Sequence, residues 1–412
     1  MVGGGVAGLS AGVALAAASA RVIVYEGAAQ AGGRCRSYFD PQLELMIDNG
    51  NHLVLSGNRA VEEYLETIGG EAGLSGPDTA SFPFVDVETK ARWKVEPNAG
   101  PLPWWVFSKS RRVPGSKPRD YFNFARLLKA EEGQRVEDVM TCRGALWTKL
   151  IAPFLVAALN TDAKAGSAVL AGEVVRETLA KGGGYCRPRI ADPLLSDAFI
   201  DPALVYIDGR GGEVRLGRRV RSLAFGHGRV VGLMLPDGLV EVGPQDSVVL
   251  AVPPWAAQEL LPGLSAPDEF HAIVNAHYRI APPANAEPIV GVIGGLAEWV
   301  FAFPDRLSVT ISAADRLLDN DREELAKRIW QDVAVVHNLP REPLPPWQIV
   351  KERRATFAAT PEQEAKRPRA ATPWENLWLA GDWTDTGLPA TLEGAVRSGR
   401  KAADLVLAST AV

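Results

Sequence analysis

The glycine-rich run at the N-terminus is the first segment whose residue types and spacing point to chemistry. Residues 3–8 read GGGVAG, so that Gly3, Gly5 and Gly8 form a G-x-G-x-x-G pattern. In a strand–turn–helix unit the first glycine permits a tight turn, the second lets the backbone approach a pyrophosphate, and the third lets the helix pack closely. The N–H groups and the positive dipole end of the helix favour bound phosphate. We expect the backbone at Gly3, Gly5, Val6, Ala7 and Gly8 to bind a dinucleotide.

A βαβ unit must position this turn. Residues 9–16 form a helix-compatible run, and the β-branched strand at 21–26 ends in Glu26, 18 residues after Gly8. A carboxylate at this position accepts hydrogen bonds from the adenosine ribose hydroxyls. The strand before the turn is reduced to Met1-Val2. Either the true start lies upstream of Met1, or the central strand is clipped, which would weaken cofactor retention.

A second turn follows closely: residues 31–37 read AGGRCRS, and an extended segment then ends in DNGNH at 48–52. An acidic strand end followed by GGRxxS resembles the superfamily of flavin-dependent amine oxidases and carotenoid desaturases. The resemblance implies that Gly32, Gly33 and Arg34 lie along the FAD pyrophosphate and ribitol, with the arginine offsetting phosphate charge. It also implies that Gly50 and Asn51 belong to a turn beside the flavin.

The middle of the chain contains a second nucleotide-proximal segment. Residues 213–252 predict a β-meander that returns to the parallel sheet, and residues 218–220 read RRV. In the family that this chain resembles, the valine of such a stretch contacts adenine through its backbone, which implies this role for Val220. Arg218 and Arg221 are individually explained as a solvated basic strand face.

The C-terminal segment contains the most informative motif. A predicted strand delivers Gly381 and Asp382, and a helix is predicted to begin near Thr391. The Asp382 carboxylate could accept hydrogen bonds from the ribitol, and the helix N-terminus at Thr391 and Leu392 could stabilise negative charge on a reduced flavin ring. Gly394 and Gly399 lie inside this helix, where glycine costs about 1 kcal/mol relative to alanine. We therefore expect a close approach of this helix to the flavin or to the sheet.

The order of motifs along the whole chain resembles one branch of that superfamily, the hydroxysqualene dehydroxylases. The matching segments are DNGNHL at 48–53, RVPG at 112–115, LNTD at 159–162, AVPPW at 251–255, LAGDWT at 379–384 and TGLPAT at 386–391. The resemblance implies an FAD-dependent oxidoreductase that reduces hydroxysqualene, a long-chain isoprenoid, to squalene. Because the chain contains one dinucleotide fingerprint, it also implies an external electron donor.

Three alternatives remain open. A carotenoid desaturase of the phytoene type would run the flavin in the opposite direction, by removing hydride from a polyene. A primary amine oxidase is disfavoured because the sequence shows no obvious aromatic cage flanking the flavin. A non-catalytic, flavoprotein-like scaffold is compatible with the clipped first strand and would purify without stoichiometric FAD.

The fold class predicted from these elements is α/β. A Rossmann-like FAD-binding domain of the glutathione reductase and amine oxidase type would carry an inserted α+β substrate domain. We assign residues 1–57, 201–255 and 351–412 to the FAD-binding domain and residues 58–200 and 256–350 to the substrate domain. Residues 289–294 and 299–303 are predicted strands of an antiparallel floor that could face a hydrophobic tunnel, and residues 321–330 are a predicted amphipathic helix.

Two side chains are candidates for assisting the departure of a hydroxyl group. His52 follows the flavin-proximal turn, and a histidine can donate a proton near neutral pH. Asp385 lies beside the C-terminal flavin motif and is the second candidate. Each has a structural alternative, His52 as an ordinary hydrogen-bonding residue and Asp385 as a turn residue before a helix. No nucleophile–base pair is legible, so the chemistry is assigned mainly to the flavin.

Composition excludes several other classes of protein. Among 412 residues, the 44 Lys and Arg against 49 Asp and Glu give a net charge of −5 and no electrostatic reason to expect nucleic acid. Three cysteines without CxxC spacing argue against a disulfide framework and favour the cytoplasm. Five histidines lack metal-binding spacing, so no metal is expected. The uncharged N-terminus is too rich in glycine and alanine for a signal peptide or a spanning helix.

One segment suggests peripheral contact with the inner face of the cytoplasmic membrane. Trp104 and Trp105 precede the segment 109–119, which contains five basic residues. Aromatic and basic side chains together could dock on an anionic bilayer, where a C30 hydrocarbon would be found. The alternative is an aromatic core loop with a solvated basic tail.

Overall fold

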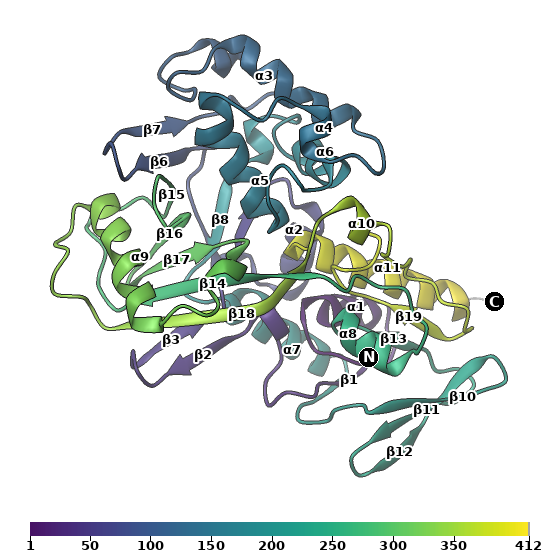
Figure 1. Cartoon of the computed structure of the whole chain (residues 1–412). Helices are drawn as coiled ribbons and strands as arrows, with labels where there is room; N and C mark the ends of the chain where they lie inside the picture. Colours follow the sequence, from purple (N-terminus) through teal and green to yellow (C-terminus); the bar gives the residue numbers. More distant parts are fainter. Residues whose placement is uncertain (411–412) are drawn as a thin grey trace.

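A parallel sheet is assembled from three distant parts of the chain (Figure 1). The computed structural model describes residues 1–410. Its strands pair in parallel, β1 (Ile23–Tyr25) with β9 (Glu213–Arg215) and β13 (Val248–Leu250) with β19 (Leu377–Leu379). Val2 bridges both Tyr25 and Leu250, so residues 1–2 join the two pairs. The short first strand noted in the sequence therefore occupies the centre of this sheet.

Two long helices, α1 (Val6–Ala17) and α11 (Leu392–Thr410), pack against each other beside this sheet. A Cβ atom at Gly399 would lie 2.2 Å from the carbonyl oxygen of Ala7. The expected close approach at Gly399 is therefore made to helix α1 rather than to the sheet. Helix α2 (Arg59–Ile68) packs against both of them, and α7 (Asp201–Asp208) packs against α1. Two further short helices are α8 (Pro254–Leu260) and α10 (Pro361–Glu364).

The predicted β-meander is present, although it starts later than expected. It consists of β10 (Ser222–Gly226), β11 (Arg229–Leu235) and β12 (Gly238–Glu241), all antiparallel. Residues 213–215, which we expected to open the meander, instead form β9 at the edge of the parallel sheet. The reason is that their backbone groups pair with β1.

A seven-stranded sheet forms the second layer, in the order β18-β14-β17-β16-β15-β6-β7. Its strands are β6 (Phe82–Asp86), β7 (Arg92–Val95), β14 (Phe270–Tyr278), β15 (Ile289–Ile293), β16 (Trp299–Phe303), β17 (Arg306–Ile311) and β18 (Trp347–Phe357). The predicted antiparallel strand pair is confirmed as β15 and β16. Helix α9 (Arg322–His337) covers one face, where its Trp330 packs on Tyr278. This helix extends beyond the 321–330 range that we predicted.

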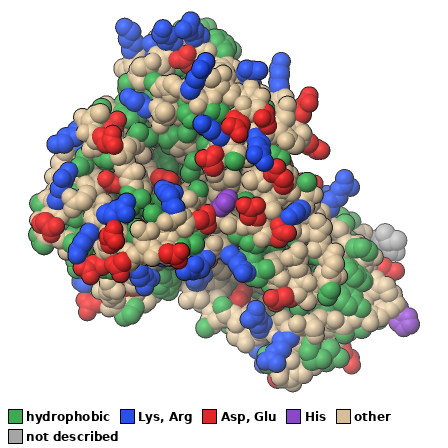
Figure 2. Space-filling view, viewed as in Figure 1, with side chains coloured by type: hydrophobic (Ala, Val, Ile, Leu, Met, Phe, Trp, Pro, Cys, Tyr) green, Lys and Arg blue, Asp and Glu red, His purple; other side chains and the backbone are tan. Residues whose placement is uncertain are grey.

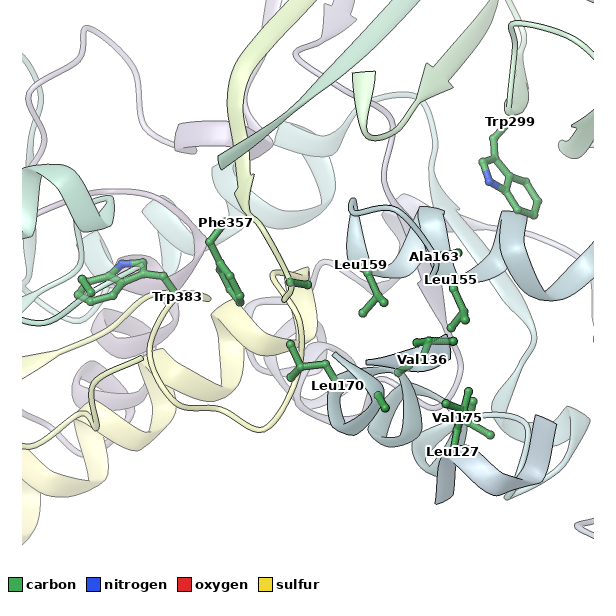
Figure 3. Packing of buried hydrophobic residues seen from close by; sticks show 14 of the residues in the cluster. Leu127, Val136, Leu155, Leu159, Ala163, Leu170, Val175, Trp299, Phe357 and Trp383 are labelled. Carbon is green, nitrogen blue, oxygen red and sulfur yellow. The ribbon is translucent and has the colours of Figure 1, made fainter. Parts of the chain in front are cut away.

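A helical lobe lies above this sheet in Figure 1. Its helices are α3 (Pro118–Phe124), α4 (Val136–Val139), α5 (Ala152–Leu159) and α6 (Ala168–Glu177), and a π-helix, Trp147–Ile151, leads into α5. Figure 3 shows Leu155, Leu159 and Leu170 on these helices in the same core cluster as Phe357 and Trp383. The lobe therefore shares its hydrophobic core with the end of β18 and with the loop after β19 (Leu377–Leu379).

Two small sheets connect the layers. The hairpin of β2 (Ser37–Asp40) and β3 (Leu45–Asp48) leads into the turn at residues 48–52, and β4 (Leu53–Leu55) then pairs with β8 (Pro188–Ala191), which also pairs with β5 (Leu74–Ser75). The seven-stranded sheet draws strands from both predicted insertions, and β18 continues past residue 350 to Phe357. The division into two domains at our boundaries stays a prediction.

Candidate cofactor and active site

The glycine-rich turn has the geometry that close backbone approach requires. Gly3 has a φ of +107°, and a Cβ atom there would lie 2.4 Å from the carbonyl oxygen of Ala251. A Cβ atom at Gly8 would lie 2.1 Å from the carbonyl oxygen of Gly3. At Gly5, in contrast, a Cβ atom would meet nothing within 4 Å. The first and third glycines are thus needed by the protein itself, whereas the second leaves a free face for a ligand.

Helix α1 begins beside that free face. Gly5 is its N-cap, the first turn has no acidic residue, and no side chain of residues 1–410 caps it. The first N–H groups of an α-helix have no partner within the helix and favour an anion. The N–H groups of Val6, Ala7 and Gly8 therefore have no partner within the helix, and their binding of phosphate stays a prediction.

Glu26 lies at the end of β1 and points back toward the same turn. Its carboxylate accepts hydrogen bonds from the backbone N–H groups of Gly4 and Ala28, both at 2.7 Å. These two bonds fix the carboxylate at the strand end and leave other lone pairs for a ribose hydroxyl. The backbone of Arg218 donates to the carbonyl of Glu26, which brings the RRV segment and the buried Val220 to this strand end.

The second turn packs directly on the first. Gly32 and Gly33 both have positive φ values, +107° and +57°, and Gly32 forms a parallel bridge with Gly5. A Cβ atom at Gly33 would lie 3.4 Å from the Cα of Gly5. The two turns therefore enclose one narrow backbone-lined edge, into which a side chain would intrude.

Arg34 follows this turn and contacts the C-terminal motif. Its Nη2 lies 2.7 Å from Oδ1 of Asp382, and its Nη1 donates to the carbonyl of Ala355 at 2.5 Å. Asp382 is buried, whereas the side chain of Arg34 as a whole is 41% exposed. The charge of Arg34 is thus already balanced by a carboxylate within the protein.

Thr391 caps helix α11, because its Oγ1 accepts a hydrogen bond from the N–H of Gly394 at 3.1 Å. Leu392 is the first residue of the helix. The buried Glu393 turns away from the motif and accepts hydrogen bonds from Ala60 and Val61 at the start of α2. A hydrogen bond from the N–H of Gly381 to Oγ of Ser398 holds helix α11 beside Gly381 and Asp382, which we call the GD motif.

The turn at 48–52 is held by the seven-stranded sheet. Nδ2 of Asn51 donates to Oγ1 of Thr310 at 3.1 Å, and this hydroxyl donates to Oδ1 of Asn275 at 2.8 Å. A Cβ atom at Gly50 would lie 3.0 Å from Nδ2 of Asn275. Neither Asn275 nor Thr310 belongs to a motif that the sequence marks, and only their cross-strand pairing on β14 and β17 reveals this role.

His52, at the end of this turn, is half-buried. Burial, together with the positive charge of Arg34, lowers its pKa to about 4. The imidazole is consequently neutral at pH 7 and has one N–H donor. Asp385 is exposed, and its backbone N–H donates to the carbonyl of Pro368 at 2.8 Å. The charges of Arg34 and Asp382 thus act on His52, whereas Asp385 is exposed to solvent.

Two further residues, to which the sequence analysis assigned no role, shape this site. A Cβ atom at Gly381 would lie 2.3 Å from Nε1 of Trp383, and the same Nε1 donates to the carbonyl of Val252 at 3.0 Å. The buried Arg367 donates to the carbonyls of Asp382 and Thr384. Trp383 adjoins the GD motif and so had a signal, whereas Arg367 stands in a loop whose sequence has none.

Comparison with known proteins decides which family has this arrangement. The sequence profile of the family described as "Flavin containing amine oxidoreductase" matches residues 6–407. This chain belongs to the flavin-containing amine oxidoreductase family. It is 54% identical to a hydroxysqualene dehydroxylase of Sinorhizobium fredii over 100% of this chain and 98% of that protein. It is 53% identical to a hydroxysqualene dehydroxylase of Rhodopseudomonas palustris over 99% of this chain and 98% of that protein.

Among solved structures, cyclohexylamine oxidase from Brevibacterium oxydans is similar in fold, with a TM-score of 0.72 and 14% identity over 100% of this chain and 98% of that chain. The predicted fold class and the predicted family are therefore confirmed. As a flavin-containing amine oxidoreductase, the protein is an FAD-dependent oxidoreductase. The open face at Gly5, the uncapped α1 and the Glu26 carboxylate fit FAD. The individual cofactor-binding residues stay predictions.

Proposed function

We propose that this flavin-containing amine oxidoreductase reduces hydroxysqualene to squalene. The observation that carries the proposal is the 54% identity to a hydroxysqualene dehydroxylase over the whole chain. FAD in its reduced form supplies the hydride, and the hydroxyl group of the substrate departs as water. The balance is hydroxysqualene plus reduced FAD to squalene, FAD and water, so each turnover needs two electrons from an external donor.

The residues of this chain would bind the cofactor and assist the leaving group. Gly3, Gly5, Val6, Ala7 and Gly8 would hold the pyrophosphate on the α1 N-terminus, with Glu26 on the ribose. Gly32, Gly33, Arg34 and Asp382 would line the ribitol side. Gly50, Asn51, Gly381, Thr391 and Leu392 would border the ring, and Val220 the adenine.

Loss of the hydroxyl leaves an allylic cation on the substrate, which water would capture. An apolar surrounding that excludes water is therefore required. We propose that His52, neutral at pH 7, donates a hydrogen bond to the departing hydroxyl; Asp385 remains the second candidate. Replacing a group that assists proton transfer lowers rates by about 10²–10⁴-fold. His52→Phe should show such a loss in kcat with little change in KM, and His52→Gln, which keeps a donor, should recover part of it.

A single-turnover experiment tests the reaction. The FAD-loaded protein is reduced anaerobically with dithionite, mixed with hydroxysqualene in detergent, and followed by flavin absorbance while the lipid is extracted. Reoxidation with stoichiometric squalene is expected. If the flavin stays reduced, the proposal fails, and oxidised protein that dehydrogenates phytoene would establish the carotenoid desaturase alternative. A folded protein that binds no FAD would favour the scaffold alternative.

We further propose that the protein works while bound to a membrane surface. Large apolar side chains are exposed in one stretch of the helical lobe: Leu102 at 63%, Trp104 at 67%, Phe107 at 61% and Phe122 at 72%. Figure 2 shows blue basic side chains gathered at the top of the molecule, over this lobe. Trp105, which we expected at this surface, is buried against Tyr121, so the expectation for Trp105 is corrected.

The arrangement suits an anionic bilayer, because aromatic side chains enter the interface while lysine and arginine attract the lipid head groups. No helix within residues 1–410 is long and apolar enough to cross a membrane. Flotation with phosphatidylcholine vesicles, with and without phosphatidylserine, tests this surface. Trp104→Ala/Phe107→Ala should bind the anionic vesicles more weakly than Leu239→Ala, a matched exposed residue on the meander. Equal binding of the two variants would contradict the proposal.

A further inference from the structure

A cleft of about 380 Å³ opens on the protein surface beside helix α8. It is lined by Trp255, Gln258, Asp268, Phe270, Arg353 and Arg354. The guanidinium of Arg354 lies 4.9 Å from the ring centroid of Trp255 and 6.0 Å from that of Phe270. Stacking on two rings holds this cation in place while its N–H donors remain free for a ligand.

The cleft adjoins the cofactor edge. Trp255, Phe270 and Arg354 also line a narrow crevice that Arg34 and Asp382 line as well. Pro253, in the same crevice, lies two residues after Ala251, whose carbonyl oxygen would lie 2.4 Å from a Cβ atom at Gly3. A molecule in the cleft would therefore lie next to the predicted FAD site and remain open to solvent.

The charges of this region leave a net surplus of positive charge. Arg34 is paired with Asp382, and Asp268 is paired with Lys366 at 2.6 Å. Arg353 and Arg354 are exposed, and within residues 1–410 neither has a carboxylate partner. Two unpaired guanidinium groups beside aromatic walls suit a phosphate ester of an aromatic ring system. The same lining is unsuited to a C30 hydrocarbon, which needs apolar walls.

We propose that this cleft binds the external electron donor, a phosphorylated aromatic hydride carrier such as a reduced nicotinamide or a reduced flavin mononucleotide. The inference rests on the proposed function, because only a reductive reaction consumes a reductant. Arg353 and Arg354 bind the phosphate, and Trp255 stacks on the aromatic ring. The donor passes a hydride to FAD, and the reduced cofactor takes up a proton from water. The balance is NADPH (or the anion FMNH⁻) plus FAD plus H⁺ to NADP⁺ (or FMN) plus FADH₂.

Calorimetric titration of the FAD-loaded protein tests the cleft, with NADP⁺ and FMN as unreactive probes in separate experiments. Saturable binding of at least one probe is expected. Arg353→Gln/Arg354→Gln should raise its dissociation constant at least about tenfold, since each lost charge-assisted bond is worth that much. Arg341→Gln, which changes an exposed arginine outside the cleft, should have no effect. Trp255→Phe should bind like the unmodified protein, and Trp255→Leu more weakly.

Three outcomes would overturn the inference: neither probe binds, the double arginine variant binds both probes as tightly as the unmodified protein, or the unloaded protein binds a probe that FAD displaces. The last result would assign the cleft to the cofactor itself, and FAD content from visible absorbance would then fall in the double variant. Failure of the proposed function is visible separately, because the dithionite-driven turnover needs no nucleotide donor.

Discussion

The glycine-rich turns and the turn at residues 48–52 are built in opposite ways. At the turns around Gly5 and Gly33, backbone meets backbone, and the absence of side chains leaves open the face that we propose binds FAD. At residues 48–52, side chains of the seven-stranded sheet hold the chain, and Asn51 contacts Thr310 across 259 residues of sequence. The first region depends on local conformation, and the second depends on distant strands arriving in register.

This difference predicts the largest effects at the glycine turns. Gly8→Ala would place a Cβ atom 2.1 Å from the carbonyl of Gly3, so the turn must shift and both thermal stability and FAD content should fall steeply. Gly5→Ala has free space and a φ of −76°. It should therefore melt like the unmodified protein while FAD affinity drops more than about tenfold, because the methyl group occupies the phosphate face. Melting curves and FAD titration check both variants. Equal FAD affinity of Gly5→Ala and the unmodified protein would show that the pyrophosphate lies elsewhere.

Asp382→Asn tests the ion pair between Arg34, which follows the second glycine turn, and Asp382. It keeps the shape of the side chain but removes the charge that pairs with Arg34 at 2.7 Å. No carboxylate then balances the positive charge of Arg34, and the ribitol loses a charged hydrogen-bond acceptor. We expect FAD affinity to fall by about tenfold with a smaller loss of thermal stability. Asp385→Asn, on the exposed side of the same loop, is the matched control and should retain FAD.

Thr310→Val probes the sheet that supports residues 48–52. The substitution removes a hydroxyl that accepts from Asn51 and donates to Asn275, and it leaves their buried polar atoms without partners. Leaving such groups unsatisfied costs about 1–3 kcal/mol of unfolding free energy. Denaturant unfolding of the unloaded protein measures this loss. Thr310→Ser, which keeps the hydroxyl, should recover most of it, and failure to recover would point to packing instead.

The smallest effect concerns pH and Glu298, which precedes β16 in the same sheet. Burial raises its pKa from 4.5 to about 7, although its carboxylate accepts a hydrogen bond from the N–H of Ser312. Between pH 4.5 and 7 the folded protein holds a proton that the unfolded chain releases, so stability falls as pH rises through this window. Glu298→Gln should melt higher than the unmodified protein at pH 8 and similarly at pH 4.5. Equal melting temperatures at pH 8 would contradict the assignment.

The sequence predicted much of the parallel sheet and its turns, because each motif there spans only a few neighbouring residues. The glycine spacing, the Glu26 strand end and the GD motif each combine a strand end with a turn, and the βαβ unit follows from their periodicity. In the structure Arg34 lies 2.7 Å from Asp382, and both act electrostatically on His52 of the 48–52 turn. Their contacts with FAD stay predictions. The exposure of Trp104 and the burial of Trp105 were not accessible, because neighbouring residues of a short 3-10 turn, Trp104–Phe107, point in different directions that only packing selects.

The sequence by itself therefore indicates the glycine-rich turn, the resemblance to flavin enzymes and the basic, aromatic composition of the lobe. Each of these is visible within a short segment of the chain. Tertiary structure decides which partners meet across the chain: Thr310 and Asn275 at the 48–52 turn, Arg367 at the carbonyl of Asp382, and Arg354 at the rings of Trp255 and Phe270. Those contacts form only when strands pair in the right register and helices pack against segments that are far away in the sequence. A side chain that acts only through such packing leaves no periodicity or spacing in the sequence.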